Sequence, residues 1–186
     1  MDCPSSTKIV HYYFAYGSNM NLVQMKQRCS SPKVLGIARL PGYKVEFYGY
    51  SGIWDGAQET VIPDLHSEVW GVLYELQFFD CESLDGYHDV RIDGTGPYFH
   101  YPVEVINREQ VMIEAMIYKK NILQEVKPPS TEYLDFIVQG AKEQGLPEGY
   151  ISLLQTKKTK PASYAVPIVQ KSKLSYMNVS CDDCGQ

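Results

Sequence analysis

The sequence predicts an α+β fold in which a small, mixed and strongly curved β-sheet or barrel is flanked by short helices. The chain has 186 residues, a length that fits one domain. Six or seven apolar segments follow one another directly through turn-forming residues, as in a meandering sheet. Only two to four short segments have helical patterns, which disfavours a doubly wound α/β fold.

The first predicted strand covers residues 9–16, which are apolar and aromatic. It leads into Gly17-Ser18-Asn19, which suits a tight loop, and residues 20–28 then predict a short helix that ends at turn-forming residues. A strand that passes through a small polar loop into a helix brings several backbone N–H groups to one point. Such a point binds anions and carboxylates, and we therefore expect this loop to hold a small substrate.

The middle of the chain predicts four short strands. Pro41-Gly42 is a strong turn signal between the first two of them, and residues 49–58 are typical of a loop. Gly71, inside the last strand, suggests a bulge or a close backbone approach. The predicted strands are 34–40, 43–48, 59–63 and 68–76.

Residues 79–90 predict one or two helical turns, with Asp80 or Ser83 as the N-cap. After a glycine-rich loop, residues 98–106 alternate in polarity and predict a half-exposed strand, which Pro102 places near a sheet edge. Residues 111–118 are its expected hairpin partner.

The last predicted elements are helical. Ser130 is a good N-cap for a helix that begins near Thr131 and ends at Gly145, and a short helix is expected over residues 148–155. Beyond Thr159 the chain is polar with weak signals. We expect one domain over residues 1–160 and a partly ordered C-terminal tail over residues 161–186.

Composition excludes some function classes. The net charge of −5 gives no basic surplus for nucleic acid, and no apolar run is long enough to span a membrane. The N-terminus does not have the pattern of a signal peptide, so we expect a cytoplasmic protein. Five cysteines in such a protein are expected to be free thiols, and the Cys181–Cys184 pair to lie in a frayed tail.

No phosphate-loop, dinucleotide or zinc-protease motif is present. The four histidines lie far apart, and Ser18 is not in a Gly-x-Ser-x-Gly elbow, so neither a metal site nor a hydrolase triad is predicted. We expect no metal and no organic cofactor.

Several separate stretches resemble the γ-glutamyl cyclotransferases, which include the AIG2-like proteins. Tyr13-Phe14-Ala15-Tyr16-Gly17-Ser18-Asn19 is similar to the substrate loop of that family nearly residue for residue. The resemblance continues in the same order over most of residues 10–155. The further matching stretches are Ala38-Arg39-Leu40, Glu68-Val69-Trp70-Gly71-Val72, Ser83-Leu84-Asp85, Pro128-Pro129-Ser130-x-x-Tyr133 and Gly140-Ala141-Lys142-Glu143-x-Gly145-Leu146-Pro147-x-x-Tyr150.

The resemblance implies an intramolecular reaction. The α-amino group of a γ-glutamyl substrate attacks its own γ-carbonyl, which closes a five-membered ring and gives 5-oxoproline and a free amine. The protein must fold the substrate into an attack geometry, stabilise the oxyanion with N–H donors, and supply a general base. The resemblance makes residues 13–19 the substrate loop and Tyr133 a pocket tyrosine, although a core aromatic on a helix face explains Tyr133 equally well.

The base is where this sequence departs from the family. The family has a Glu three residues after the Asp of the Leu-Asp pair, and this chain has His88 there, followed by Asp89. Three interpretations stay open: His88 is the base, a nearby carboxylate such as Asp89 or Glu82 replaces it, or the site binds small molecules without turning them over. The expected partner is a small γ-glutamyl molecule, with no nucleic acid and no membrane; the oligomeric state is open, and a homodimer is one alternative.

Overall fold

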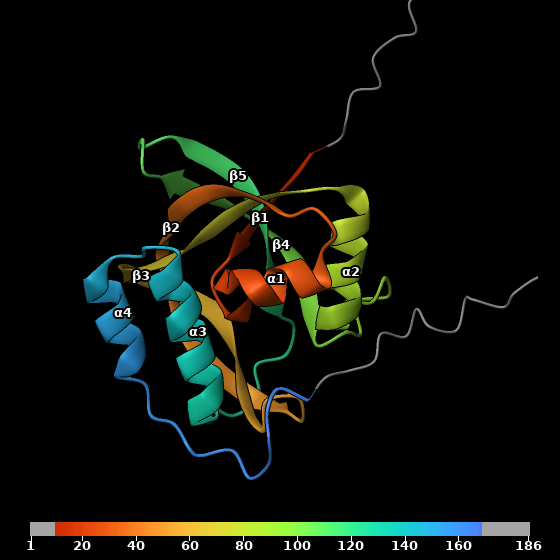
Figure 1. Ribbon diagram of the computed structural model, residues 1–186, viewed down its shortest axis with the longest axis vertical. Coiled ribbons are helices and arrows are strands. Elements are labelled where there is room, and N and C mark those ends of the chain that lie inside the picture. The colour runs from red at the N-terminus through yellow and green to blue at the C-terminus, as the bar shows by residue number, and fades with distance from the viewer. Residues whose placement is uncertain (1–9, 169–186) are drawn as a thin grey trace, which may run out of the picture.

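The computed structural model describes residues 10–168, and within them five strands close into a barrel in the order β1-β3-β2-β4-β5 (Figure 1). Neighbouring strands are antiparallel, except that β1 and β5 close the barrel in parallel. The predicted α+β class with a small barrel is therefore confirmed. The strands are β1 (His11–Ala15), β2 (Lys33–Ser51), β3 (Gly56–Leu76), β4 (Tyr98–Asn107) and β5 (Met112–Lys120).

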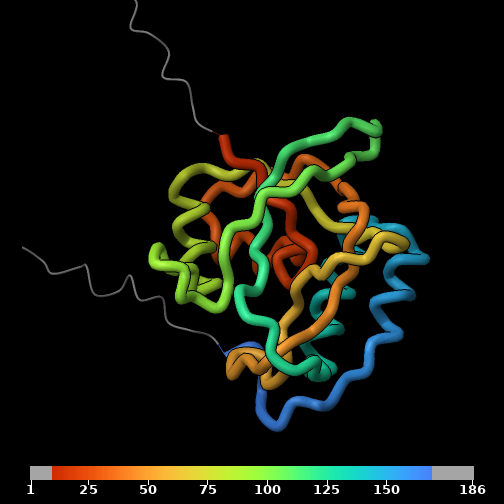
Figure 2. Tube along the Cα trace, turned by 180° about the vertical axis from the view of Figure 1, so that it is seen from behind, coloured from red at the N-terminus to blue at the C-terminus, as the bar shows by residue number. Residues whose placement is uncertain are grey.

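Short helices surround this barrel. Figure 1 shows α3 and α4 together on one side, α2 on the other side, and α1 across the front. Figure 2, from behind, shows the β4–β5 hairpin on the opposite face. A short 3-10 turn, η1, joins β1 to α1. The helical elements are η1 (Ser18–Met20), α1 (Leu22–Arg28), α2 (Phe78–His88), α3 (Thr131–Glu143) and α4 (Glu148–Gln155).

The prediction of a turn at Pro41-Gly42 was wrong. β2 continues through these residues, and its register with β3 shifts between Pro41 and Tyr43, where Gly42 has a φ of 77°. This left-handed conformation, which costs glycine little, bends the strand instead of reversing it. The chain reverses at residues 52–55, inside the segment predicted as a loop. Each long strand therefore joins two predicted short strands, so there are fewer strands than expected.

The start of α2 also differs from the prediction. Gln77, and neither Asp80 nor Ser83, is the N-cap. Asp80 is the third helical residue and completes a capping box with Gln77. Its carboxylate also accepts a 2.7 Å hydrogen bond from the backbone N–H of Ser30, so it ties α2 to the turn after α1.

Helix α3 forms as predicted and holds the loop after β1. Ser130 is its N-cap and accepts a hydrogen bond from the backbone N–H of Tyr133, and Gly145 follows its end with a φ of 70°. Gly140 lies against η1, because a Cβ at this position would come within 2.6 Å of the backbone nitrogen of Asn21. The glycine lets α3 pack directly on the loop.

The segment after Thr159 is hydrogen-bonded to the β2–β3 hairpin. The Ser163 backbone N–H donates to Asp55 at 2.6 Å, and the Tyr164 hydroxyl donates to the carbonyl of Gly52 at 2.6 Å. The domain boundary at residue 160 stays a prediction, and Cys181 and Cys184 lie outside the described residues.

Candidate active site

A small pocket lined largely by tyrosines lies between strands of the barrel and α2. Its walls come from β1 and the following loop, β3, α2, β4 and β5. The lining residues are Tyr13, Tyr16, Gly17, Asn19, Glu59, His88, Tyr98 and Tyr118. A wider groove runs between residues 34–37 of β2 and residues 107–109 at the end of β4, but none of the predicted site residues lines it.

The predicted substrate loop lies at this pocket, although its residues divide into two groups. Tyr13, Tyr16, Gly17 and Asn19 line the pocket, whereas Phe14 and Ala15 are fully buried in the core. Ser18 is also buried, and its backbone N–H faces the Glu59 carboxylate.

Asn19 holds the loop in place. Its side-chain nitrogen donates to the Tyr13 hydroxyl at 2.8 Å, its side-chain oxygen accepts from Arg28, and its carbonyl accepts from the Tyr74 hydroxyl at 3.1 Å. The same nitrogen is 3.4 Å from Nε2 of His88. The carbonyls of Gly17 and Ser18 accept the hydrogen bonds of η1, and the first N–H groups of such a turn have no intrahelical partner.

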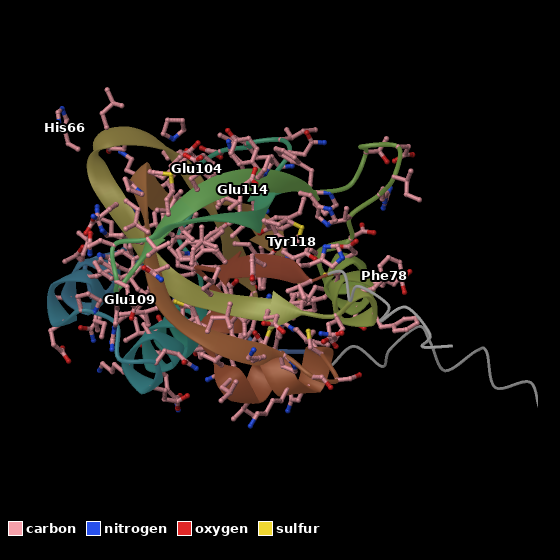
Figure 3. All side chains as sticks on the ribbon, turned by 90° about the horizontal axis from the view of Figure 1, so that it is seen from above. His66, Phe78, Glu104, Glu109, Glu114 and Tyr118 are labelled. Atoms are coloured by element: carbon pink, nitrogen blue, oxygen red, sulfur yellow. The ribbon has the colours of Figure 1, made fainter. Side chains whose placement is uncertain are left out.

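His88 lies in the pocket. Its ring stacks on the Tyr118 ring with centroids 4.0 Å apart, and Tyr118 lies beside β1 in Figure 3. Nδ1 of His88 is buried and has no hydrogen-bond partner among the described residues. Burial, and then the positive charge of Arg28, lower the His88 pKa well below its usual value, so the ring is neutral at neutral pH. A neutral imidazole with so low a pKa is a weak base.

The carboxylate of Asp85 holds the Tyr118 side chain in place through its hydroxyl group. The Tyr118 hydroxyl donates to Asp85 at 2.6 Å, and Nε2 of His100 lies 2.6 Å from the same oxygen. Asp85 therefore supports the aromatic wall on which His88 stacks.

Asp89 and Glu82 are not brought to the pocket. Asp89 follows the end of α2 in the left-handed conformation, is exposed, and pairs with Arg91 at 2.9 Å. Glu82 is exposed on α2. Neither carboxylate lines the pocket that His88 lines.

The carboxylate that does line the pocket belongs to Glu59. The sequence predicted this residue only as part of a strand. Glu59 is buried, and a Cβ at Gly17 would overlap its carboxylate. The Tyr133 hydroxyl donates to its side-chain oxygen. Burial raises the Glu59 pKa, although Tyr133 and the Ser18 N–H, among weaker influences, act in the opposite direction. No motif marked this position.

Tyr133 combines both interpretations that the sequence left open. It is only 1% exposed, and its ring packs against Trp54 with centroids 4.4 Å apart, as expected of a core aromatic. Its hydroxyl reaches Glu59, so it supports a residue of the pocket.

Arg28 is a second residue of the site that no sequence motif predicted. Its guanidinium lies 3.1 Å from the centroid of the Tyr87 ring and donates to Asn19. Burial lowers its pKa, while Tyr87 and other nearby groups act in the opposite direction. Arg28 ends α1, and a basic residue at that position also suits the helix dipole.

Within residues 10–168, no three His, Cys, Asp or Glu side chains gather as they would around a metal ion. No helix in this part of the chain has both the length and the apolar character needed to cross a membrane.

Comparisons with known proteins agree with the fold and with the order of the motifs. The model of the AIG2-like family matches residues 68–154. The chain is 34% identical over 142 residues to gamma-glutamylcyclotransferase from Mus musculus and to that from Homo sapiens, and the match covers 74% of this chain and 73% of each relative. A solved structure named gamma-glutamyl cyclotransferase superposes with a TM-score of 0.79 at 31% identity, covering 85% of this chain and 94% of that one.

Proposed function

This chain belongs to the gamma-glutamylcyclotransferase family of enzymes, and we propose that it forms 5-oxoproline from a γ-glutamyl amino acid, peptide or amine. The observation that carries this proposal is the meeting of the Tyr13–Asn19 loop with a buried carboxylate in one small pocket. The loop offers N–H donors, and the carboxylate can accept a proton.

The reaction is intramolecular, so the pocket mainly has to fold the substrate. The rigid aromatic wall of Tyr98 and Tyr118 limits the conformations that a bound γ-glutamyl group can take. Holding the α-amino nitrogen near the γ-carbonyl carbon supplies much of the rate enhancement of such ring closures. The Gly17 N–H group is the proposed donor to the oxyanion that forms when the nitrogen attacks, because the Ser18 N–H faces the Glu59 carboxylate.

The test is product formation from a panel that includes γ-glutamyl dipeptides, glutathione and γ-glutamyl amines, with 5-oxoproline measured by mass spectrometry. The same dipeptides with an acetylated α-amino group are the matched control, because they have no free amine for the attack. We expect 5-oxoproline from at least one free-amine substrate and none from its acetylated form. No product from the whole panel would contradict the proposed reaction.

A second candidate is a binding protein of the same fold that does not turn its ligand over. The presence of a neutral His88, where the resemblance leads us to expect a Glu, favours it. Such a protein would be stabilised by a γ-glutamyl ligand without releasing 5-oxoproline. Saturation at one hundred times Kd would add about 2.7 kcal/mol, or roughly 5–11 °C in Tm for a chain of this size.

A further inference from the structure

We infer that Glu59, on β3, is the general base of this site, in place of residue 88 on α2, to which the resemblance points. This inference rests on the proposed function. Its first support is position: Glu59 and His88 both line the pocket that the Gly17 loop lines. The carboxylate lies so close to Gly17 that only a glycine leaves room for it.

The second support is the free-energy cost of burying the Glu59 carboxylate without a cation beside it. Glu59 is 8% exposed, and among the described residues it forms no ion pair within 4 Å. A buried carboxylate without a cation is strongly unfavourable. The ammonium group of a γ-glutamyl substrate is a cation that would enter this pocket, and its pairing with Glu59 would remove the cost.

The third support comes from the surroundings of Glu59, because burial raises its pKa above the usual carboxyl value. Raised carboxyl pKa values are typical of general acids and bases. Tyr133 on α3 donates to one oxygen, and His88 on α2, which lines the same pocket, is neutral. The charge of Glu59 also influences, or is influenced by, five other titratable groups around it. They are Lys120 on β5, Arg28 on α1, Tyr98 on β4, Tyr13 on β1, and Tyr16 just after β1.

In the proposed reaction, Glu59 carries protons between the substrate's two nitrogens. The Glu59 carboxylate takes one proton from the α-ammonium, and the freed amine forms a bond to the γ-carbonyl carbon. Glu59 then gives that proton to the departing nitrogen, and the bond between this nitrogen and the carbonyl carbon breaks. The ring nitrogen gives its extra proton to Glu59, which passes it to the released amine. The products are 5-oxoproline and an ammonium ion, and Glu59 is again a carboxylate.

The test compares Glu59→Gln and Glu59→Asp with Glu104→Gln. Glu104 is an exposed glutamate of β4, next to Glu114 on the hairpin shown in Figure 3 and outside the pocket. We expect Glu59→Gln to lower kcat about 100-fold or more, Glu59→Asp to recover part of the loss, and Glu104→Gln to match the wild type. Glu59→Gln should keep the stabilisation by 5-oxoproline, because this product has no ammonium group.

The pH profile separates a base from a purely structural residue. The kcat/KM of the wild type should fall at acid pH as Glu59 is protonated, and this limb should be missing from the residual activity of Glu59→Gln. Activity of Glu59→Gln within threefold of the wild type would overturn the inference. A Glu59→Ala variant faster than the wild type would also overturn it, because the side chain would then be a plug. If the wild type forms no 5-oxoproline, the proposed function is contradicted, and so is the inference that depends on it.

Discussion

Removing the Tyr133 hydroxyl tests how the barrel holds the Glu59 carboxylate. Tyr133→Phe deletes one oxygen and keeps the ring, whose contacts with Trp54 and Phe47 stay in place. The hydroxyl donates to Glu59 in a fully buried setting, so the carboxyl loses its side-chain donor.

The expected loss depends on the protonation of Glu59. A hydrogen bond to a neutral group contributes about 1 kcal/mol, and one to a charged group about 1.5–3 kcal/mol. The Tyr133 hydroxyl opposes the upward shift of the Glu59 pKa, so it stabilises the ionised form. Tyr133→Phe should therefore cost more stability above the Glu59 pKa than below it. At alkaline pH the loss of about 1.5–3 kcal/mol corresponds to roughly 3–12 °C in Tm.

The assay is urea unfolding at several pH values from 5 to 8.5, with Tyr12→Phe as the matched control. Tyr12 is 41% exposed, so its variant should stay within about 0.5 kcal/mol of the wild type. A Tyr133→Phe variant as stable as Tyr12→Phe at every pH would show that the Tyr133 hydroxyl does not stabilise the Glu59 carboxylate. A loss of stability that is larger at acid pH would contradict a preference of this hydroxyl for the ionised form.

Three further variants test the packing of α3 on η1, the pairing of β4 with β5, and the N-cap of α3. Gly140→Ala places a Cβ 2.6 Å from the Asn21 nitrogen, so it should cost about 1–3 kcal/mol in urea unfolding and raise the KM by displacing η1. Glu114→Lys replaces a like-charged cross-strand pair with Glu104 by an opposite pair and should raise the unfolding free energy by about 0.2–1 kcal/mol. Ser130→Ala removes the N-cap of α3 and should cost about 0.5–2 kcal/mol, without a change in the pH dependence of kcat/KM.

Stability should also depend on pH through Glu59 itself. Its folded pKa is raised above the unfolded value, mainly by burial, so between these two values the folded state binds more protons. The unfolding free energy contributed by this group should therefore fall as pH rises from about 4.3, the ordinary Glu value, through the raised pKa. Glu59→Gln should remove this fall, which urea unfolding across the same pH range would reveal.

Local patterns in the sequence predicted most of the helices and strands, but they did not predict the bend within β2. The cap at Ser130 and the glycine at residue 145 fixed the ends of α3, because capping is a local property. Pro41-Gly42 has the composition of a turn, yet Gly42 only bends β2. Whether a left-handed glycine reverses or bends a strand depends on the partner strand, and β3 pairs with β2 on both sides of the bend.

The candidate site was predictable only where a motif marks it. The Tyr13–Asn19 loop and His88 were found because their order matches a known family, and the structure brings both to one pocket. Glu59 lies in a strand among apolar and polar residues and has no signature. Its importance appears only when the barrel closes, because closure places its side chain against Gly17, far from it in sequence.

The most direct test of a general base on β3 is the rate of 5-oxoproline formation by the double variant Glu59→Ala, His88→Glu, compared with the rate of each single variant. A side chain at position 88 reaches Asn19, so a carboxylate there can replace one at position 59 in the same pocket. We expect Glu59→Ala to be nearly inactive and the double variant to recover at least tenfold more activity. A Glu59→Ala variant with wild-type activity, or a double variant no faster than Glu59→Ala, would contradict the claim that the base lies on β3.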